Sequence, residues 1–143
     1  MKTPQRGANP WRSAAVILAV VILLGWMAGI AGAQDSEQAA VGKVTYRVYC
    51  QSCHGAGGKG DGKLAEMMKV TPADLTQLSK KNGGSFPADK VAGVIDGRED
   101  VLAHGGREMP VWGQNFLEKT GNEEDVKTRV RQLVLFLESI QAK

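Results

Sequence analysis

Cys50, Cys53 and His54 stand within five consecutive residues, at the start of the stretch "CQSCHGAGGKGDG". They are the only two cysteines and one of only two histidines in the 143-residue chain. This spacing can serve a dithiol redox pair, a zinc site or the attachment of a c-type haem. The glycines that follow add a phosphate-binding loop as a fourth possibility.

Three of these four possibilities find little support in the surrounding sequence. A thioredoxin-type redox pair needs a βαβ context, and none is visible. A structural zinc site needs four protein ligands, and His54 is attached directly to Cys53, where it is awkwardly placed to complete a tetrahedron. Gly57 to Lys63 fits the phosphate-loop spacing, but Leu64 stands where a magnesium-binding Ser or Thr should be.

Cys-x-x-Cys-His is the attachment signature of c-type haem, and its spacing has a physical reason. Residues three apart on a helical turn face the same way, so both sulfurs can bond the two vinyl groups at one porphyrin edge. His54, next along the chain, can turn its imidazole to the iron. We therefore predict one haem c, attached covalently through Cys50 and Cys53 and bound at the iron by His54.

Haem iron with histidine on one side can take methionine, histidine or no protein ligand on the other. The candidates are Met67, Met68, His104 and Met109. Met67 and Met68 fall in a predicted helix, where methionine usually fills gaps in a core. His104 lies between Ala103 and two glycines, as an exposed loop histidine would. Met109 precedes Pro110, which fixes the backbone there.

Helical spacing of apolar residues, with helix-start and helix-stop residues, predicts an all-α domain. The predicted helices span Glu37–Cys50, Leu64–Val70, Leu75–Lys81, Pro87–Gly97 and a last amphipathic segment from Asn122 onward. In the last of these, Val126, Val130, Leu133, Leu137 and Ile140 follow alternating spacings of four and three. From Arg98 to Gly121 no period is sustained, which predicts a long functional loop with one turn inside.

From Gly42 to Ile140 the chain resembles a class I cytochrome c of the small bacterial periplasmic type. In that family a glycine and an aromatic residue stand eight and four residues before the first haem cysteine, and Gly42 and Tyr46 match those offsets. The resemblance implies that the N- and C-terminal helices cross around one haem, with Leu133 and Phe136 as the matching contacts. The "MP" of "EMPVWG" resembles the family's axial-methionine loop, which implies Met109 as the second iron ligand.

The chain departs from the family pattern after His54. Mitochondrial-type members have a proline about a dozen residues on, whose carbonyl orients the proximal imidazole, whereas Glu66 stands at that offset here. Pro72 is the nearest proline and is a candidate for the corresponding loop. The sequence leaves the hydrogen-bond acceptor for His54 unassigned.

Residues 14–33 contain no charged side chain and follow a segment whose only charges are Lys2, Arg6 and Arg12. A basic start, an apolar core and small residues at 31–33 are typical of a signal peptide, but about 20 apolar residues also suffice to span a bilayer. We therefore predict that residues 1–33 are a signal peptide or an uncleaved membrane anchor, and that residues 34–143 form the cytochrome c domain. The membrane is a partner only if residues 14–33 are retained.

Charge excludes a nucleic-acid partner. Three of the 18 basic residues and none of the 15 acidic ones precede Gln34, so residues 34–143 carry no formal net charge. Nucleic-acid surfaces need clustered Lys and Arg on the folded domain.

The resemblance implies electron transfer in the periplasm, by a domain that is soluble or attached to the outer face of the cytoplasmic membrane. The redox partners would be respiratory or dehydrogenase proteins and an oxidase, and no catalytic residue is implied. The first alternative is a membrane-anchored cytochrome c subunit of a respiratory complex. The second, less favoured, is a ligand-binding haem sensor or peroxidase, which requires Met109 not to be bound.

Overall fold

The computed structural model describes residues 32–98 and 109–142. The chain divides into two units, residues 1–35 and 36–143. Nearly all of the segment predicted to be a signal peptide or anchor therefore lies outside the described residues. Within the described ranges, no helix is long and apolar enough to cross a membrane.

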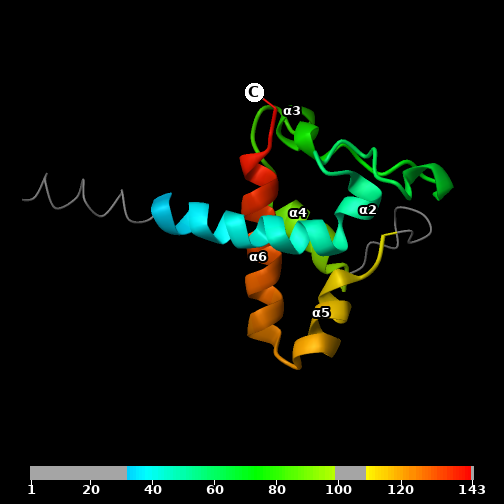
Figure 1. Cartoon of the computed structure of the whole chain (residues 1–143). Helices are drawn as coiled ribbons and strands as arrows, with labels where there is room; N and C mark the ends of the chain where they lie inside the picture. The colour runs from blue at the N-terminus through cyan, green and yellow to red at the C-terminus, as the bar shows by residue number, and fades with distance from the viewer. Residues whose placement is uncertain (1–31, 99–108, 143) are drawn as a thin grey trace, which may run out of the picture. The chain divides into compact units, whose positions relative to one another are not determined.

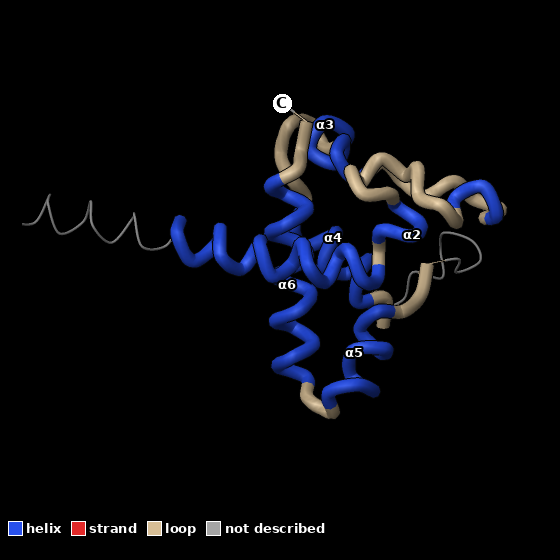
Figure 2. The backbone as a smooth tube through the Cα atoms, viewed as in Figure 1, coloured by secondary structure: helices blue, strands red, loops and turns tan. Residues whose placement is uncertain are grey.

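Every regular element of the described residues is helical, as predicted (Figure 1). After the N-terminal helix, described over residues 32–49, the chain forms α2 (Gln51–His54), η1 (Ala65–Met67), η2 (Leu75–Gln77), α3 (Leu78–Lys81), α4 (Ala88–Asp96), α5 (Trp112–Thr120) and α6 (Glu123–Ser139). The two η elements are single 3₁₀ turns. Figure 2 shows that loops make up most of the path from α2 to α3.

Helix α6 provides most of the core, and its ends follow from its sequence. The side chain of Asn122 accepts a hydrogen bond from the backbone N–H of Glu124 at 3.0 Å, which caps the first turn. Three acidic residues in that turn complement the helix dipole. The predicted four-three spacing is confirmed, because its apolar positions from Val126 to Leu137 are buried.

The N-terminal helix crosses α6 at Gly42 and Tyr46 (Figure 1). A β-carbon built on Gly42 would overlap the backbone carbonyl of Gln132 and lie 3.0 Å from the backbone nitrogen of Leu133. Only glycine allows the two backbones to approach so closely. The rings of Tyr46 and Phe136 pack 5.1 Å apart between centroids. The crossing implied by the resemblance is confirmed.

Two sequence-based assignments need correction. The helix predicted over Leu64–Val70 is only the single turn η1. The long loop predicted from Arg98 to Gly121 contains a nine-residue helix, α5, which ends at Gly121 in the left-handed conformation. Its buried side is formed by Gly113 and Phe116 alone, which is too little apolar periodicity to detect in the sequence.

Candidate cofactor site

The Cys-x-x-Cys-His stretch folds as one helical turn. The N–H of His54 donates to the carbonyl of Cys50 at 2.9 Å, and Gly55, at φ +80°, ends the turn. Tyr46, on the crossing helix, donates its hydroxyl proton to the carbonyl of Gly55 at 2.7 Å, and this bond is buried. Cys50 and Cys53 are partly buried, and neither is in a disulfide.

The turn opens on an apolar cavity of about 330 Å³. The cavity is lined by Tyr46, Cys50, His54, Ala73, Leu75, Leu78, Lys81, Asn82, Pro87, Lys90, Val91, Val94, Ile95, Met109 and Leu137. Three of the four predicted site residues, namely Cys50, His54 and Met109, therefore meet at one cavity. Cys53 lies on the same turn but is not among the lining residues.

His54 has the acceptor that the sequence left unassigned. Its ring nitrogen Nδ1 donates to the carbonyl oxygen of Ala73 at 3.1 Å. Ala73 is brought there because the glycine-rich loop packs against residues 72–75, where the N–H of Leu75 donates to the carbonyl of Gly58 at 2.7 Å. Burial lowers the pKa of His54, and the bond to Ala73 opposes that shift. The neutral imidazole, the form that binds metals, is favoured.

Burial favours the neutral thiol at Cys50. Burial, followed by the neighbouring Cys53, raises the pKa of the Cys50 thiol to about 12. Redox-active and zinc-binding cysteines need the thiolate, which a low pKa supplies. No group of three or more His, Cys, Asp or Glu residues suited to a metal ion occurs in the described part of the chain. Both observations weigh against the redox-pair and zinc alternatives.

Met109 lines the cavity, and α5 begins three residues later within an aromatic cluster. The ring of Trp112, the first residue of α5, packs 5.4 Å from that of Tyr49 and 5.9 Å from that of Phe116 between centroids, and Trp112 does not line the cavity. Of the rival ligands, Met67 is 80% exposed, and neither Met67 nor Met68 lines the cavity. His104 lies outside the described residues.

Lys81, Asn82 and Lys90 are the polar side chains of the lining that sequence reasoning missed. They lie on or directly after α3 and on α4, and all three are exposed. Charged residues on short helices usually face solvent, and no pattern in the sequence shows which cavity they border. Only the folded arrangement of α3 and α4 identifies them.

The residues present fit a haem. The cavity volume lies within the range of cofactor pockets, and its lining is mostly aliphatic. Val94 lines it while remaining 44% exposed. A histidine and a methionine, both known haem ligands, border the same space.

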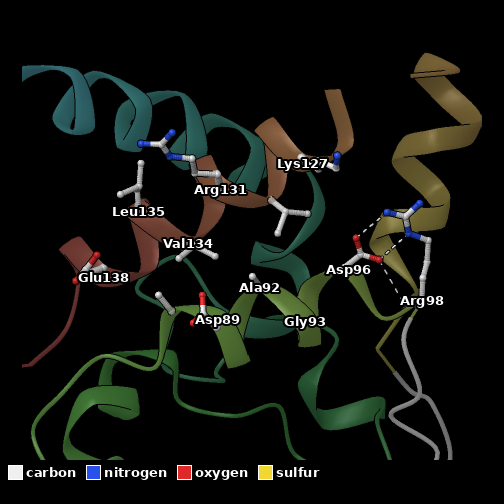
Figure 3. A pocket seen from close by; sticks show the side chains of 12 residues that line it. Asp89, Ala92, Gly93, Asp96, Arg98, Lys127, Arg131, Val134, Leu135 and Glu138 are labelled. Atoms are coloured by element: carbon white, nitrogen blue, oxygen red, sulfur yellow. Dashed lines mark hydrogen bonds and ion pairs between the residues drawn. The ribbon is translucent and has the colours of Figure 1, made fainter. Parts of the chain in front are cut away.

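A second, larger cavity of about 780 Å³ lies between α4 and α6 (Figure 3). Ala92, Val130, Val134 and Leu135 form its apolar part, and charged side chains surround them. It contains none of the predicted site residues. The smaller cavity, which Cys50, His54 and Met109 line, is therefore the candidate cofactor site.

An all-α domain with a Cys-x-x-Cys-His turn facing an apolar cavity defines a cytochrome c domain. Residues 37–126 match the family described as cytochrome C oxidase, cbb3-type, subunit III, and the chain belongs to that family. No curated protein and no solved structure matches the chain. Membership implies covalently bound haem c and a role in haem-based electron transfer, which agrees with the two cysteines at positions 50 and 53.

Proposed function

We propose that this chain is a mono-haem electron carrier in which Cys50 and Cys53 hold the haem and His54 and Met109 are the axial ligands. The observation that carries the proposal is that His54 and Met109, far apart in the sequence, line the same apolar cavity as Cys50. Bound haem supplies one-electron chemistry. The protein's own residues hold the group, orient the ligands and exclude water.

Several contacts support these roles of the protein's own residues. The carbonyl of Ala73 fixes the ring of His54 by accepting from Nδ1, so that Nε2 keeps its lone pair. Aliphatic side chains of α4 and α6 keep the cavity apolar. Methionine opposite histidine raises the reduction potential, which suits a protein that passes electrons to an oxidase. No general acid, base or nucleophile is needed for this function.

We place this activity in the periplasm, either in a soluble domain or at the outer face of the cytoplasmic membrane. The uncharged segment 14–33 after a basic start supports export, and the family supports redox partners that include an oxidase complex. The membrane-anchored subunit is the second candidate, because the family takes its name from an oxidase subunit. Intact mass decides between them. A mature N-terminus at Gln34 supports the soluble carrier, and an uncut chain in the membrane fraction supports the anchored subunit.

The ligand set is tested by absorption spectroscopy of the purified haem protein. We expect the oxidised protein to show the weak far-red band of methionine-to-iron charge transfer. Met109→Ala should abolish that band and open the reduced iron to carbon monoxide, while His104→Ala should leave both unchanged. Loss of the band in His104→Ala with its retention in Met109→Ala would overturn the assignment, whereas a wild type that lacks the band and binds carbon monoxide would favour the ligand-binding alternative.

A further inference from the structure

Arg98 joins two carboxylates that come from different parts of the chain. Its Nε donates to Asp96 Oδ1 at 2.7 Å and its Nη2 to Asp96 Oδ2 at 2.9 Å. Its Nη1 donates to both oxygens of Glu123, at 2.7 and 3.0 Å. The side chains of Arg98 and Asp96 are only 28% and 26% exposed. Figure 3 shows the Asp96–Arg98 pair at the rim of the larger cavity.

This ion-pair group lies where the end of α4 meets the start of α5. Gly97, at φ +67°, ends α4, and a β-carbon built on it would lie 3.4 Å from the α-carbon of Val111. A β-carbon on Gly113 would overlap Asp96 Oδ1 and lie 2.7 Å from Arg98 Nε. The described residues on the two sides of segment 99–108 are therefore in contact, and Glu123 connects them to the first turn of α6.

We propose that Arg98 is a positioning residue for Met109: by binding Asp96 and Glu123 above Gly113, it holds the start of α5 against α4 and α6 and keeps Met109 at the cavity. This inference rests on the proposed function, because it assumes that Met109 binds the iron. Met109 precedes Val111 by two residues and Gly113 by four, so little chain separates the ligand from the held segment.

The chemistry of the side chain explains why arginine suits this role. Its planar guanidinium presents donors in a fixed fork that can engage two carboxylates at once, whereas a lysine ammonium is a point charge without that geometry. Single exposed ion pairs are weak, but this group uses four side-chain hydrogen bonds, joins the end of α4 to the start of α6 and packs against Gly113 of α5, although Glu123 itself is 52% exposed. It is therefore suited to fix a position more than to add stability.

The test compares two neighbouring substitutions in the haem-loaded protein. Glu123→Ala removes a partner of Arg98, and Glu124→Ala removes the partner of Lys127, an exposed pair at 2.7 Å on the same helical turn. Both remove one acidic side chain from the first turn of α6, so their effects through the helix dipole match. Arg98→Lys keeps the charge without the fork, and Gly113→Ala displaces the ion pair without changing any charge.

The readouts are the far-red band and the rate at which carbon monoxide binds the reduced protein. We expect Glu123→Ala, Arg98→Lys and Gly113→Ala to weaken the band and to raise that rate about two- to fivefold, the range available to one partly exposed ion pair. Glu124→Ala should match the wild type. Because carbon monoxide competes only at the iron, a general loss of stability that Glu124→Ala shares would not produce this difference.

Two failures are distinguishable. If Met109→Ala changes neither readout, the proposed function fails and this inference with it. If Met109→Ala changes both readouts while Glu123→Ala and Arg98→Lys remain indistinguishable from Glu124→Ala, Met109 is a ligand and only the role of Arg98 is refuted. Should Glu123→Ala not fold, Arg98→Lys and Gly113→Ala decide the question by the same two readouts.

Discussion

Nδ1 of His54 donates to the carbonyl oxygen of Ala73 at 3.1 Å, and this bond fixes which ring nitrogen is available to a metal. The acceptor is a backbone atom of the residue after Pro72. Gly60 sets its position, because a β-carbon at Gly60 would overlap the carbonyl oxygen of Pro72. Close packing therefore explains the glycine at position 60 without a phosphate ligand. This glycine allows one loop to pack closely under another, and so orients the histidine.

Gly60→Ala should disturb that orientation. The new methyl group pushes against the Pro72–Ala73 peptide, and Gly60 has φ +81°, which costs a residue with a side chain about 1–2 kcal/mol. A weaker bond to Nδ1 makes the imidazole a poorer electron donor, so the reduction potential of the haem protein should rise. Potentiometric titration measures the potential, and denaturant titration measures the free energy of unfolding.

Gly57→Ala is the matched control for that experiment. Gly57 lies in the same loop with a negative or extended φ, and a β-carbon there would approach only the side chain of Lys59, at 4.0 Å. We expect its potential to equal that of the wild type. An unchanged potential in Gly60→Ala as well would show that the Ala73 bond does not tune the histidine.

A second prediction concerns the crossing of the N-terminal helix with α6. Gly42→Ala places a methyl group against the backbone carbonyl of Gln132, which cannot move aside as a side chain can. The helices must separate, and the free energy of unfolding should fall by about 3 kcal/mol. Gly93→Ala on α4 has no atom within 4 Å of its new methyl group, so it should raise that free energy by about 0.5–1 kcal/mol. Denaturant titrations of the two variants should therefore show changes in unfolding free energy of opposite sign. An unchanged unfolding free energy in Gly42→Ala would contradict the close crossing.

The two helices that cross were predictable because each has a strong local signal. The spacing of Val126, Val130 and Leu133 and the cap at Asn122 define α6, and Gly42 has a fixed offset from Cys50. The helix α5 was missed because its main apolar contacts come from Trp112 and Phe116 and depend on Tyr49, which is distant in the sequence. Tertiary packing decides such a segment.

Backbone groups were the least predictable part of the site. The carbonyl of Ala73 carries no side-chain signature, and its place depends on how two loops fold together. The same holds for the carbonyl of Gly55, which accepts from Tyr46. The sequence identified Cys50, His54 and Met109 because their side-chain types are specific to the chemistry. The groups that orient these ligands became visible only in the fold.

A third prediction follows from the hydroxyl of Tyr46. It is buried and donates to the carbonyl of Gly55 at 2.7 Å, so Tyr46→Phe leaves that carbonyl without this partner. Because the N–H of Gly58 still donates to that carbonyl at 3.2 Å, the loss should be about 0.5–1.5 kcal/mol of unfolding free energy. Tyr49→Phe removes only an exposed contact, in which Lys119 Nζ donates to the hydroxyl at 3.2 Å, and should cost far less. Equal losses in the two variants would contradict a special role for the turn at Gly55.

A fourth prediction uses acid to test Arg98. Hydrogen bonds from Arg98 hold the pKa of Asp96 below its ordinary value of 3.8. A lowered pKa in the folded state means that the carboxylate stabilises the fold above pH 3.8, and that this contribution is lost as the pH falls through the folded-state value. The difference in unfolding free energy between the wild type and Arg98→Met should therefore be constant at neutral pH and shrink below pH 3.8. A difference that stays constant into strong acid would contradict the pairing.

The last prediction concerns the polar rim of the cavity, where Lys81 and Lys90 are exposed. If electrons enter the haem there, a negatively charged reagent such as hexacyanoferrate should react more slowly with the double variant Lys81→Glu, Lys90→Glu. The charge difference acts locally, since residues 34–143 carry no formal net charge, so the rate should fall only severalfold, less than the roughly 10–10³-fold of strongly steered pairs. Lys43→Glu with Lys119→Glu makes the same change in net charge at residues that do not line the cavity. Stopped-flow traces at low ionic strength should separate the two double variants, and added salt should bring their rates together. If both pairs slow the reaction equally, electrons do not enter at this rim.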